Sequence, residues 1–181
     1  MRSIPALIVL PAAFAAGAAA GAQEYLSQAE ARKAIFPDAD AFVDVTVALT
    51  DAQRQAIQKL GGSRQRWKSQ VVWRAEQEGK PVGWFVVDEV VGKHESITYA
   101  VGIAPGGVVQ GIEILVYRET YGYQVREADW RKRFVGKTVK DPLQLDGDIP
   151  NITGATLSCR NVTAGVKRLL ALYEIVFAHA Q

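Results

Sequence analysis

The middle of the chain consists of short runs of β-branched and aromatic residues that are separated by glycine- and proline-containing turns. Four such runs lie at 70–75, 82–91, 96–103 and 108–117. Links this short join strands in antiparallel order, because a parallel crossover needs a dozen or more residues. The pattern therefore predicts a four-stranded antiparallel meander and disfavours a doubly wound sheet.

Helical patterns lie on both sides of the predicted sheet. Ser27 and Thr50 are expected to cap short helices that run to about Phe36 and over 51–60. From 156 to about 177, apolar residues recur at spacings of three and four, which indicates a long amphipathic helix. The predicted fold class is α+β: an antiparallel β-meander sheet packed against a long C-terminal helix, with short N-terminal helices.

Two further local patterns complete the expected secondary structure. Trp130 and Phe134, four residues apart, indicate a short helix over 128–134 with both rings on one face. Residues 141–150 are expected to form a loop.

The first residues resemble an export signal. Arg2 precedes an apolar stretch, and Ala20-Gly21-Ala22 forms an A-x-A cleavage site, so we predict a signal peptide over 1–22 that is cleaved before Gln23. An uncleaved membrane anchor is the alternative. The predicted location is periplasmic or extracytoplasmic. Residues 23–69 are expected to be a helical N-terminal segment of the same domain as 70–181.

Composition excludes several classes of function. The net charge is +2 over 181 residues, and the charges are interspersed, so no nucleic-acid partner is expected. Cys159 is the one cysteine, and the two histidines, His94 and His179, lie far apart. A disulfide framework, a metal site and a Ser-His-Asp triad are therefore not expected, and no catalytic residue is assigned.

The start of the last predicted helix carries the most distinctive chemistry. The run from Pro150 to Gly154 resembles a turn, so Thr153 or Gly154 is the expected cap and Thr156 lies in the first turn. Free N–H groups and the helix dipole favour an anion such as phosphate there. Many helices begin this way without a ligand, so ordinary capping is the competing interpretation.

The run Thr153-Gly154-Ala155-Thr156, followed by Leu157 and Ser158, resembles the flavinylation motif of the FMN-binding domain family. This family includes the C and G subunits of the sodium-pumping quinone reductase and Rnf complexes. Further similar segments lie at 99–112, at Glu119-Thr120-Tyr121-Gly122 and at 130–137. Pro150 stands where family members commonly have Asp, and the nearest acid is Asp148.

The resemblance implies FMN bound covalently through a phosphoester to Thr156, and it implies an electron carrier with no substrate pocket of its own. It also implies an ApbE-like flavin transferase and a membrane or periplasmic redox protein as partners, with membrane association only through partners or an uncleaved signal. The cofactor-binding residues that it assigns are Thr153, Gly154, Ala155, Thr156, Leu157, Ser158, Glu119, Thr120, Tyr121 and Gly122.

Two other functions remain open at this point. The chain is alternatively a terminal flavin reductase that passes electrons directly to a small molecule. It is alternatively a secreted binding or scaffold domain that keeps the fold and has lost flavinylation.

Overall fold

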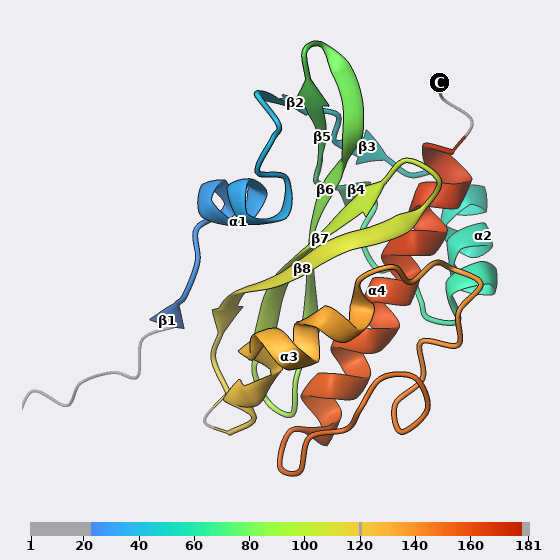
Figure 1. The fold of residues 1–181 in the computed structure, drawn as a ribbon. Helices are drawn as coiled ribbons and strands as arrows, with labels where there is room; N and C mark the ends of the chain where they lie inside the picture. The colour runs from blue at the N-terminus through green and yellow to red at the C-terminus, as the bar shows by residue number, and fades with distance from the viewer. Residues whose placement is uncertain (1–22, 120, 179–181) are drawn as a thin grey trace, which may run out of the picture.

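The computed structural model describes residues 23–119 and 121–178, which form three layers (Figure 1). A twisted antiparallel sheet is the middle layer. Helix α1 (Gln28–Ile35) covers one face, helix α4 (Thr156–Val176) covers the other, and helix α2 (Asp51–Gly61) packs beside α4. The predicted α+β class is confirmed. The signal peptide predicted over 1–22 lies outside the described residues.

Six strands form the sheet, and every neighbouring pair is antiparallel. Their order is β1 (Gln23–Glu24), β8 (Val108–Tyr117), β7 (Ser96–Ala104), β6 (Lys80–Val91), β5 (Val72–Gln77) and β2 (Ala41–Asp44). Strands β5 to β8 follow each other in space as they do in sequence. The predicted meander is therefore confirmed, and two edge strands extend it.

The predicted first strand, 70–75, is wrong at its start. Gln70 belongs to β4 (Ser69–Gln70), which pairs with β3 (Val47–Ala48) in a separate two-stranded sheet, and β5 begins only at Val72. Gln70 is buried, and its Nε2 donates to the carbonyl of Val87 at 2.6 Å. Gln70 thus pairs through its backbone with β3 and through its side chain with β6, and a local pattern reveals neither contact.

Both N-terminal helices begin at the predicted caps. Ser27 Oγ accepts from the N–H of Glu30, and the Glu30 carboxylate accepts from the N–H of Ser27, which is a capping box. Thr50 and Gln53 form the same arrangement at α2. Gly62 ends α2 with a φ of 72°, as a left-handed C-cap requires.

The C-terminal end of helix α1 lies very close to the sheet because the strand residues that it contacts are glycines, which have no side chain. Ile35 and Phe36, at its C-terminal end, lie over Gly83 on β6 and Gly102 on β7. A Cβ on Gly83 would be 2.5 Å from Cε1 of Phe36, and one on Gly102 would meet Ile35 even more closely. The glycines of the strands therefore have a packing role on the face opposite α4.

The main core lies between α4 and the sheet. The inward side chains of α4 are almost fully buried: Cys159, Val162, Val166, Leu169, Leu170 and Tyr173. Tyr173 packs edge-on against Trp84 of β6, with ring centroids 5.0 Å apart. This packing fixes the position of the first turn of α4 relative to the end of the sheet.

One ion pair is buried in the same interface. Arg168 of α4 pairs with Asp88 of β6, and their side chains are 6% and 0% exposed. The Asp88 carboxylate also accepts from Tyr99 Oη at 2.7 Å and from Trp67 Nε1 at 3.1 Å. Burial, together with the charge of Asp88, raises the pKa of the Tyr99 phenol well above its usual range.

The segment that connects β8 to α4 contains short helices and an ordered loop. The predicted helix over 128–134 divides into α3 (Ala128–Arg131) and a 3-10 turn, η2 (Lys132–Phe134), and another 3-10 turn, η1 (Tyr123–Arg126), precedes them. The rings of Trp130 and Phe134 lie 4.9 Å apart on one face, as predicted.

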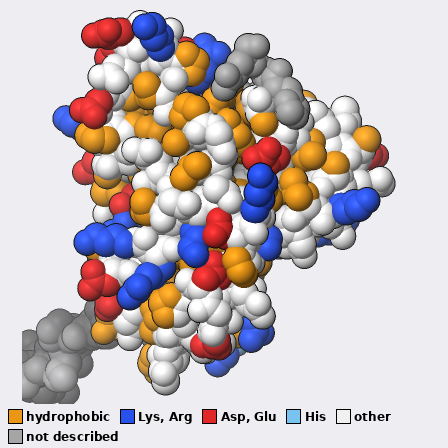
Figure 2. All heavy atoms as spheres, turned by 45° about the vertical axis from the view of Figure 1, so that its right-hand side comes forward, with side chains coloured by type: hydrophobic (Ala, Val, Ile, Leu, Met, Phe, Trp, Pro, Cys, Tyr) orange, Lys and Arg blue, Asp and Glu red, His pale blue; other side chains and the backbone are white. Residues whose placement is uncertain are grey.

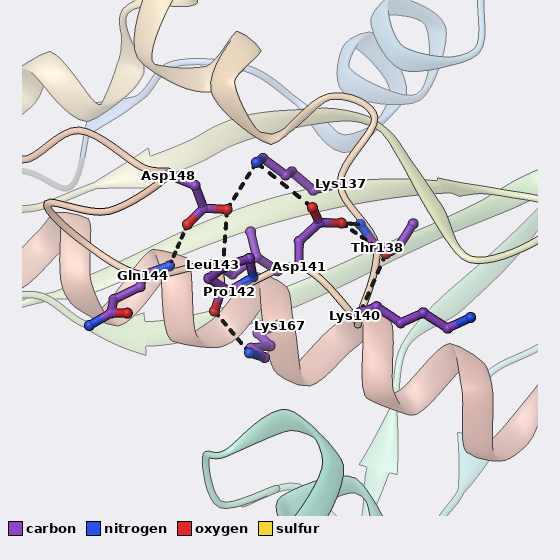
Figure 3. A network of polar contacts seen from close by, with 9 residues as sticks. All are labelled: Lys137, Thr138, Lys140, Asp141, Pro142, Leu143, Gln144, Asp148 and Lys167. Carbon is purple, nitrogen blue, oxygen red and sulfur yellow. Dashed lines mark hydrogen bonds and ion pairs between the residues drawn. The ribbon is translucent and has the colours of Figure 1, made fainter.

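Figure 3 shows how the loop before α4 is held. Lys137 Nζ lies 2.9 Å from the carboxylate of Asp148 and 3.9 Å from that of Asp141. Lys167 of α4 donates to the carbonyl of Pro142 at 2.8 Å. The loop therefore reaches the start of α4 with its path fixed by these contacts.

Charges of both signs are mixed over the face drawn in Figure 2, as the interspersed sequence predicts. Within residues 23–119 and 121–178, no helix combines the length and the apolar character that crossing a membrane requires.

Candidate functional site

Helix α4 begins with an open N-terminus. Its N-cap is Ala155, and no side chain caps the helix, so the expectation that Thr153 or Gly154 is the cap is wrong. The N–H of Ala155 bonds to the carbonyl of Ile152, and Gly154 has a φ of 85°. Because of this tight turn, the N-cap is Ala155, one residue after Gly154. The first N–H groups of a helix have no intrahelical acceptors, so the turn at Thr156 to Ser158 offers free donors.

A cavity of about 350 Å³ opens in front of this turn. Its lining comes from three parts of the chain: the turn between β6 and β7, the loop after β8 and the start of α4. The lining residues are Lys93, His94, Glu119, Tyr121, Gly154, Ala155, Thr156, Leu157 and Ser158. This volume falls within the range of small-molecule sites.

Seven of the ten residues assigned from the sequence line this cavity together: Glu119, Tyr121, Gly154, Ala155, Thr156, Leu157 and Ser158. Thr153 is exposed in the preceding turn and is not part of the lining. Gly122 is not part of the lining but packs against Ala155, which is, and Thr120 lies outside the described residues. The structure therefore places two segments more than 30 residues apart around one hollow.

Lys93 and His94 line the cavity and are absent from the sequence assignment. The sequence marks Gly92 and Lys93 only as a turn between two strands. Their place at the cavity follows from the pairing of β6 with β7, which brings this turn beside the loop after β8. Lys93 adds a basic residue to the lining that the start of α4 also forms.

Glu119 holds the Lys93 turn in place. Its Oε1 accepts from the backbone N–H groups of His94 at 2.6 Å and Glu95 at 2.9 Å. Partial burial acts to raise the pKa of the carboxyl, but these hydrogen bonds outweigh it, and the net pKa is lowered. Glu119 is thus a structural brace for the turn that carries the lining residues Lys93 and His94.

Replacing Glu119 by Gln tests this brace. We expect Glu119→Gln to lower the free energy of unfolding by about 1 kcal/mol near neutral pH, because charge-assisted hydrogen bonds are lost. The folded pKa is depressed, so the contribution is present above the ordinary value and is lost as pH falls through the lowered one. In urea unfolding, the difference in the free energy of unfolding between the wild type and Glu119→Gln should therefore shrink below about pH 4. The exposed Glu127→Gln is the control, and an equal loss there would contradict the brace.

The loop after β8 and the start of α4 make a tight contact next to the cavity lining. A Cβ on Gly122, whose φ is 84°, would lie 2.7 Å from Tyr117 Oη and 2.9 Å from the Cβ of Ala155. Tyr117 Oη donates to the carbonyl of Tyr121 at 2.5 Å and lies 3.3 Å from Oγ of Ser158. Burial raises the pKa of the Tyr117 phenol, so it remains a hydrogen-bond donor.

One aromatic side chain belongs to the cavity lining. It is Tyr121, which is 79% exposed. An exposed phenol ring at the rim of a cavity offers a flat apolar surface for a planar ligand.

The remaining candidates near the site have structural partners. Pro150, which departs from the family pattern, uses its carbonyl to accept from Trp130 Nε1 at 2.9 Å. Cys159 is fully buried, and burial raises the pKa of its thiol. Among the residues that the structure describes, no group of three or more His, Cys, Asp or Glu side chains is placed to hold a metal ion.

Residues 92–171, which contain the whole cavity lining, match the model of the family described as the FMN-binding domain. The resemblance predicted from the sequence is confirmed. The described donors also fit such a ligand, because an uncapped helix start, a lysine and a hydroxyl-bearing residue meet at one cavity.

Curated relatives share part of this chain. The G subunit of an ion-translocating oxidoreductase complex from Shewanella oneidensis is 35% identical over 108 residues, which are 52% of this chain and 50% of that protein. The G subunit of a Na⁺-translocating ferredoxin:NAD⁺ oxidoreductase complex from Acetobacterium woodii is 28% identical over 113 residues, 57% and 55% of the two chains. The chain spans about half the length of these relatives.

The fold has a counterpart among solved structures. The crystal structure of Shewanella oneidensis NqrC superposes with a TM-score of 0.55 and 16% identity, covering 83% of this chain and 90% of that one. At this identity the likeness concerns the fold alone.

Proposed function

We propose that this chain is an extracytoplasmic electron-transfer flavoprotein that carries FMN as a phosphoester of Thr156. The observation that carries the proposal is the position of Thr156: it is the first residue of an uncapped 21-residue helix and lines the cavity of the FMN-binding domain match. Its hydroxyl therefore lies where free N–H groups and the helix dipole favour a phosphate.

Several residues around Thr156 would hold the cofactor, each in a different way. Leu157, Ser158 and Lys93 line the cavity, and the N–H groups of the first two and the ammonium of Lys93 would stabilise phosphate charge. Gly154 has no side chain to obstruct the approach, and a Cβ there would meet nothing within 4 Å. Tyr121 offers a ring at the rim. Glu119 keeps Lys93 and His94 at the cavity.

FMN supplies reversible uptake of one or two electrons, and the protein sets its exposure and its hydrogen bonds. Attachment requires the Thr156 hydroxyl to lose its proton and its oxygen to form a P–O bond. In the family that the sequence resembles, a transferase provides the FMN moiety from FAD, whose pyrophosphate bond breaks to release AMP. We propose an ApbE-like transferase as that partner.

The partners and location are part of the same proposal. Two relatives are named as subunits of oxidoreductase complexes that translocate ions. We propose that this chain likewise exchanges electrons with a membrane or periplasmic redox protein. We also propose that the chain consists of a signal peptide over 1–22, an N-terminal segment over 23–69 and an FMN-binding domain over 70–181.

A visible spectrum tests the proposal. The chain is produced with a flavin transferase, precipitated with acid, and redissolved in denaturant. We expect the yellow flavin absorbance to remain with the pellet, and expect none from the same chain produced without the transferase. A colourless pellet in both samples would contradict the proposal and favour a scaffold that has lost flavinylation.

A further inference from the structure

A second cavity, of about 300 Å³, shares no lining residue with the cavity at Thr156. Its lining comes from the segment after α2, the end of β6 and α4. The lining residues are Ser63, Arg64, Arg66, Val90, Val91, Asn161, Ala164 and Arg168. We refer to it as the arginine cavity.

The arginine cavity is built as a cationic hollow. Among the described residues that line it, three are arginines and none is acidic. Arg168 is 5% exposed, and its charge is matched by Asp88 behind it. Arg64 and Arg66 are exposed residues of the lining, which contains no acidic residue to match their two charges.

Neutral donors and fixed backbone complete the lining. The hydroxyl of Ser63 lies 3.3 Å from the carbonyl of Ala164, and Asn161 Nδ2 donates to the carbonyl of Val91 at 2.6 Å. These contacts join the segment after α2 and the end of β6 to α4. The cavity walls are therefore held by tertiary contacts and do not depend on a ligand.

Arg168 also has unused hydrogen-bonding capacity. Its Nε atom is buried and has no hydrogen-bond partner among the described residues, although its Nη2 pairs with Asp88. A buried guanidinium with an unmatched donor is costly. Arg168 also lines the cavity, so an anion bound there would add a favourable Coulomb interaction with its guanidinium group.

We propose that the arginine cavity binds a phosphate group, either free or in the headgroup of an anionic lipid. Planar guanidinium groups are the side chains best suited to phosphate oxygens. The same segment continues with Trp67, which is 43% exposed, and with the exposed Lys68. An aromatic ring between basic residues is also the pattern that favours the surface of an anionic membrane.

The two cavities share one structural element. Val91 lines the arginine cavity, and Lys93, two residues later, lines the cavity at Thr156. A phosphate bound at Arg64 and Arg66 on a lipid surface would therefore place the cavity at Thr156 close to that surface. The site nevertheless rests on its own residues and stands whether or not FMN is attached.

Residue-resolved NMR distinguishes this site from the start of α4. Inorganic phosphate is titrated into the isotope-labelled protein, with acetate at equal ionic strength as the comparison. We expect saturable shifts of the amide signals of Ser63, Arg64 and Asn161 with phosphate only. Arg64→Ala/Arg66→Ala should weaken binding about tenfold, because each exposed ionic contact is worth up to roughly a factor of five. Lys80→Ala/Lys140→Ala removes the same amount of charge elsewhere on the surface and should leave phosphate binding unchanged.

Vesicle sedimentation distinguishes the two sources of phosphate. Vesicles of phosphatidylcholine with phosphatidylglycerol are compared with vesicles of phosphatidylcholine alone. Binding to the anionic vesicles that is lost in Arg64→Ala/Arg66→Ala identifies a lipid headgroup, whereas phosphate shifts without vesicle binding identify a free phosphate. The proposal is overturned if neither probe binds, if acetate acts equally, or if the control variant loses as much as the arginine variant.

Discussion

Thr156→Ala, produced together with a flavin transferase, is expected to carry no covalent flavin. The hydroxyl of Thr156 is the proposed ester oxygen, and alanine removes it without disturbing the fold, because the side chain is only half-buried at the first turn of α4. Intact-mass measurement should show the full increment of FMN less one water on the wild type. The same measurement should show none on the variant.

Two matched variants separate attachment from folding. Thr153→Ala removes a neighbouring hydroxyl that is exposed and does not line the cavity, so we expect the FMN increment to persist. Thr156→Ser keeps a hydroxyl at the same position, and we expect at least partial attachment. An FMN increment on Thr156→Ala equal to that of the wild type would place the ester elsewhere.

Asp88→Ala is expected to lower the free energy of unfolding by about 3–5 kcal/mol, because it leaves the charge of Arg168 buried and unmatched. It also removes the acceptor of Tyr99 Oη and Trp67 Nε1. Since domains of this size are stable by roughly 5–15 kcal/mol, the loss is a large share of the total. Urea unfolding monitored by tryptophan fluorescence measures it.

The control for Asp88 is an ion pair whose acidic side chain is exposed. Asp51 is 83% exposed beside Arg54, so Asp51→Ala should change stability little. Asp88→Leu/Arg168→Met removes both buried charges, and we expect it to be more stable than Asp88→Ala. Equal stability of Asp88→Ala and the wild type would contradict the role of the pair.

Local sequence signals predict those parts of the fold whose causes are local. The capping boxes at Ser27 and Thr50 form between residues three positions apart, so each is visible in a short stretch of sequence. Strands β6, β7 and β8 are long and joined by short turns, which limits their pairing to one order. The last helix, with its apolar spacing, is predicted for the same reason.

The missed elements depend on contacts that are distant in sequence. Strands β1 and β3 have two residues each, and β2 has four, so their patterns are too short to separate from loops. Their strand character comes from partners such as β8 and β5. The buried bond of Gln70 to Val87, 17 positions away, likewise has no local signal.

The sequence predicts only part of the candidate site, because the remaining residues reach it through contacts that are distant in sequence. Gly154 and Thr156 belong to one motif, and the loop at Glu119 belongs to another, so a family resemblance finds both. Lys93 and His94 reach the cavity only through strand pairing and the brace of Glu119. The cap at Ala155 follows from the positive φ of Gly154, which the sequence permits but does not dictate.

The most direct test of the central claim is the position of the flavin on the chain. Trypsin should release a peptide over residues 141–160, which ends at Arg160 and contains Thr153, Thr156 and Ser158. Fragmentation of this peptide from protein produced with a flavin transferase assigns the modified side chain. We expect the increment of FMN less one water on Thr156; the increment on Thr153 or Ser158, or an unmodified peptide, would contradict attachment at Thr156.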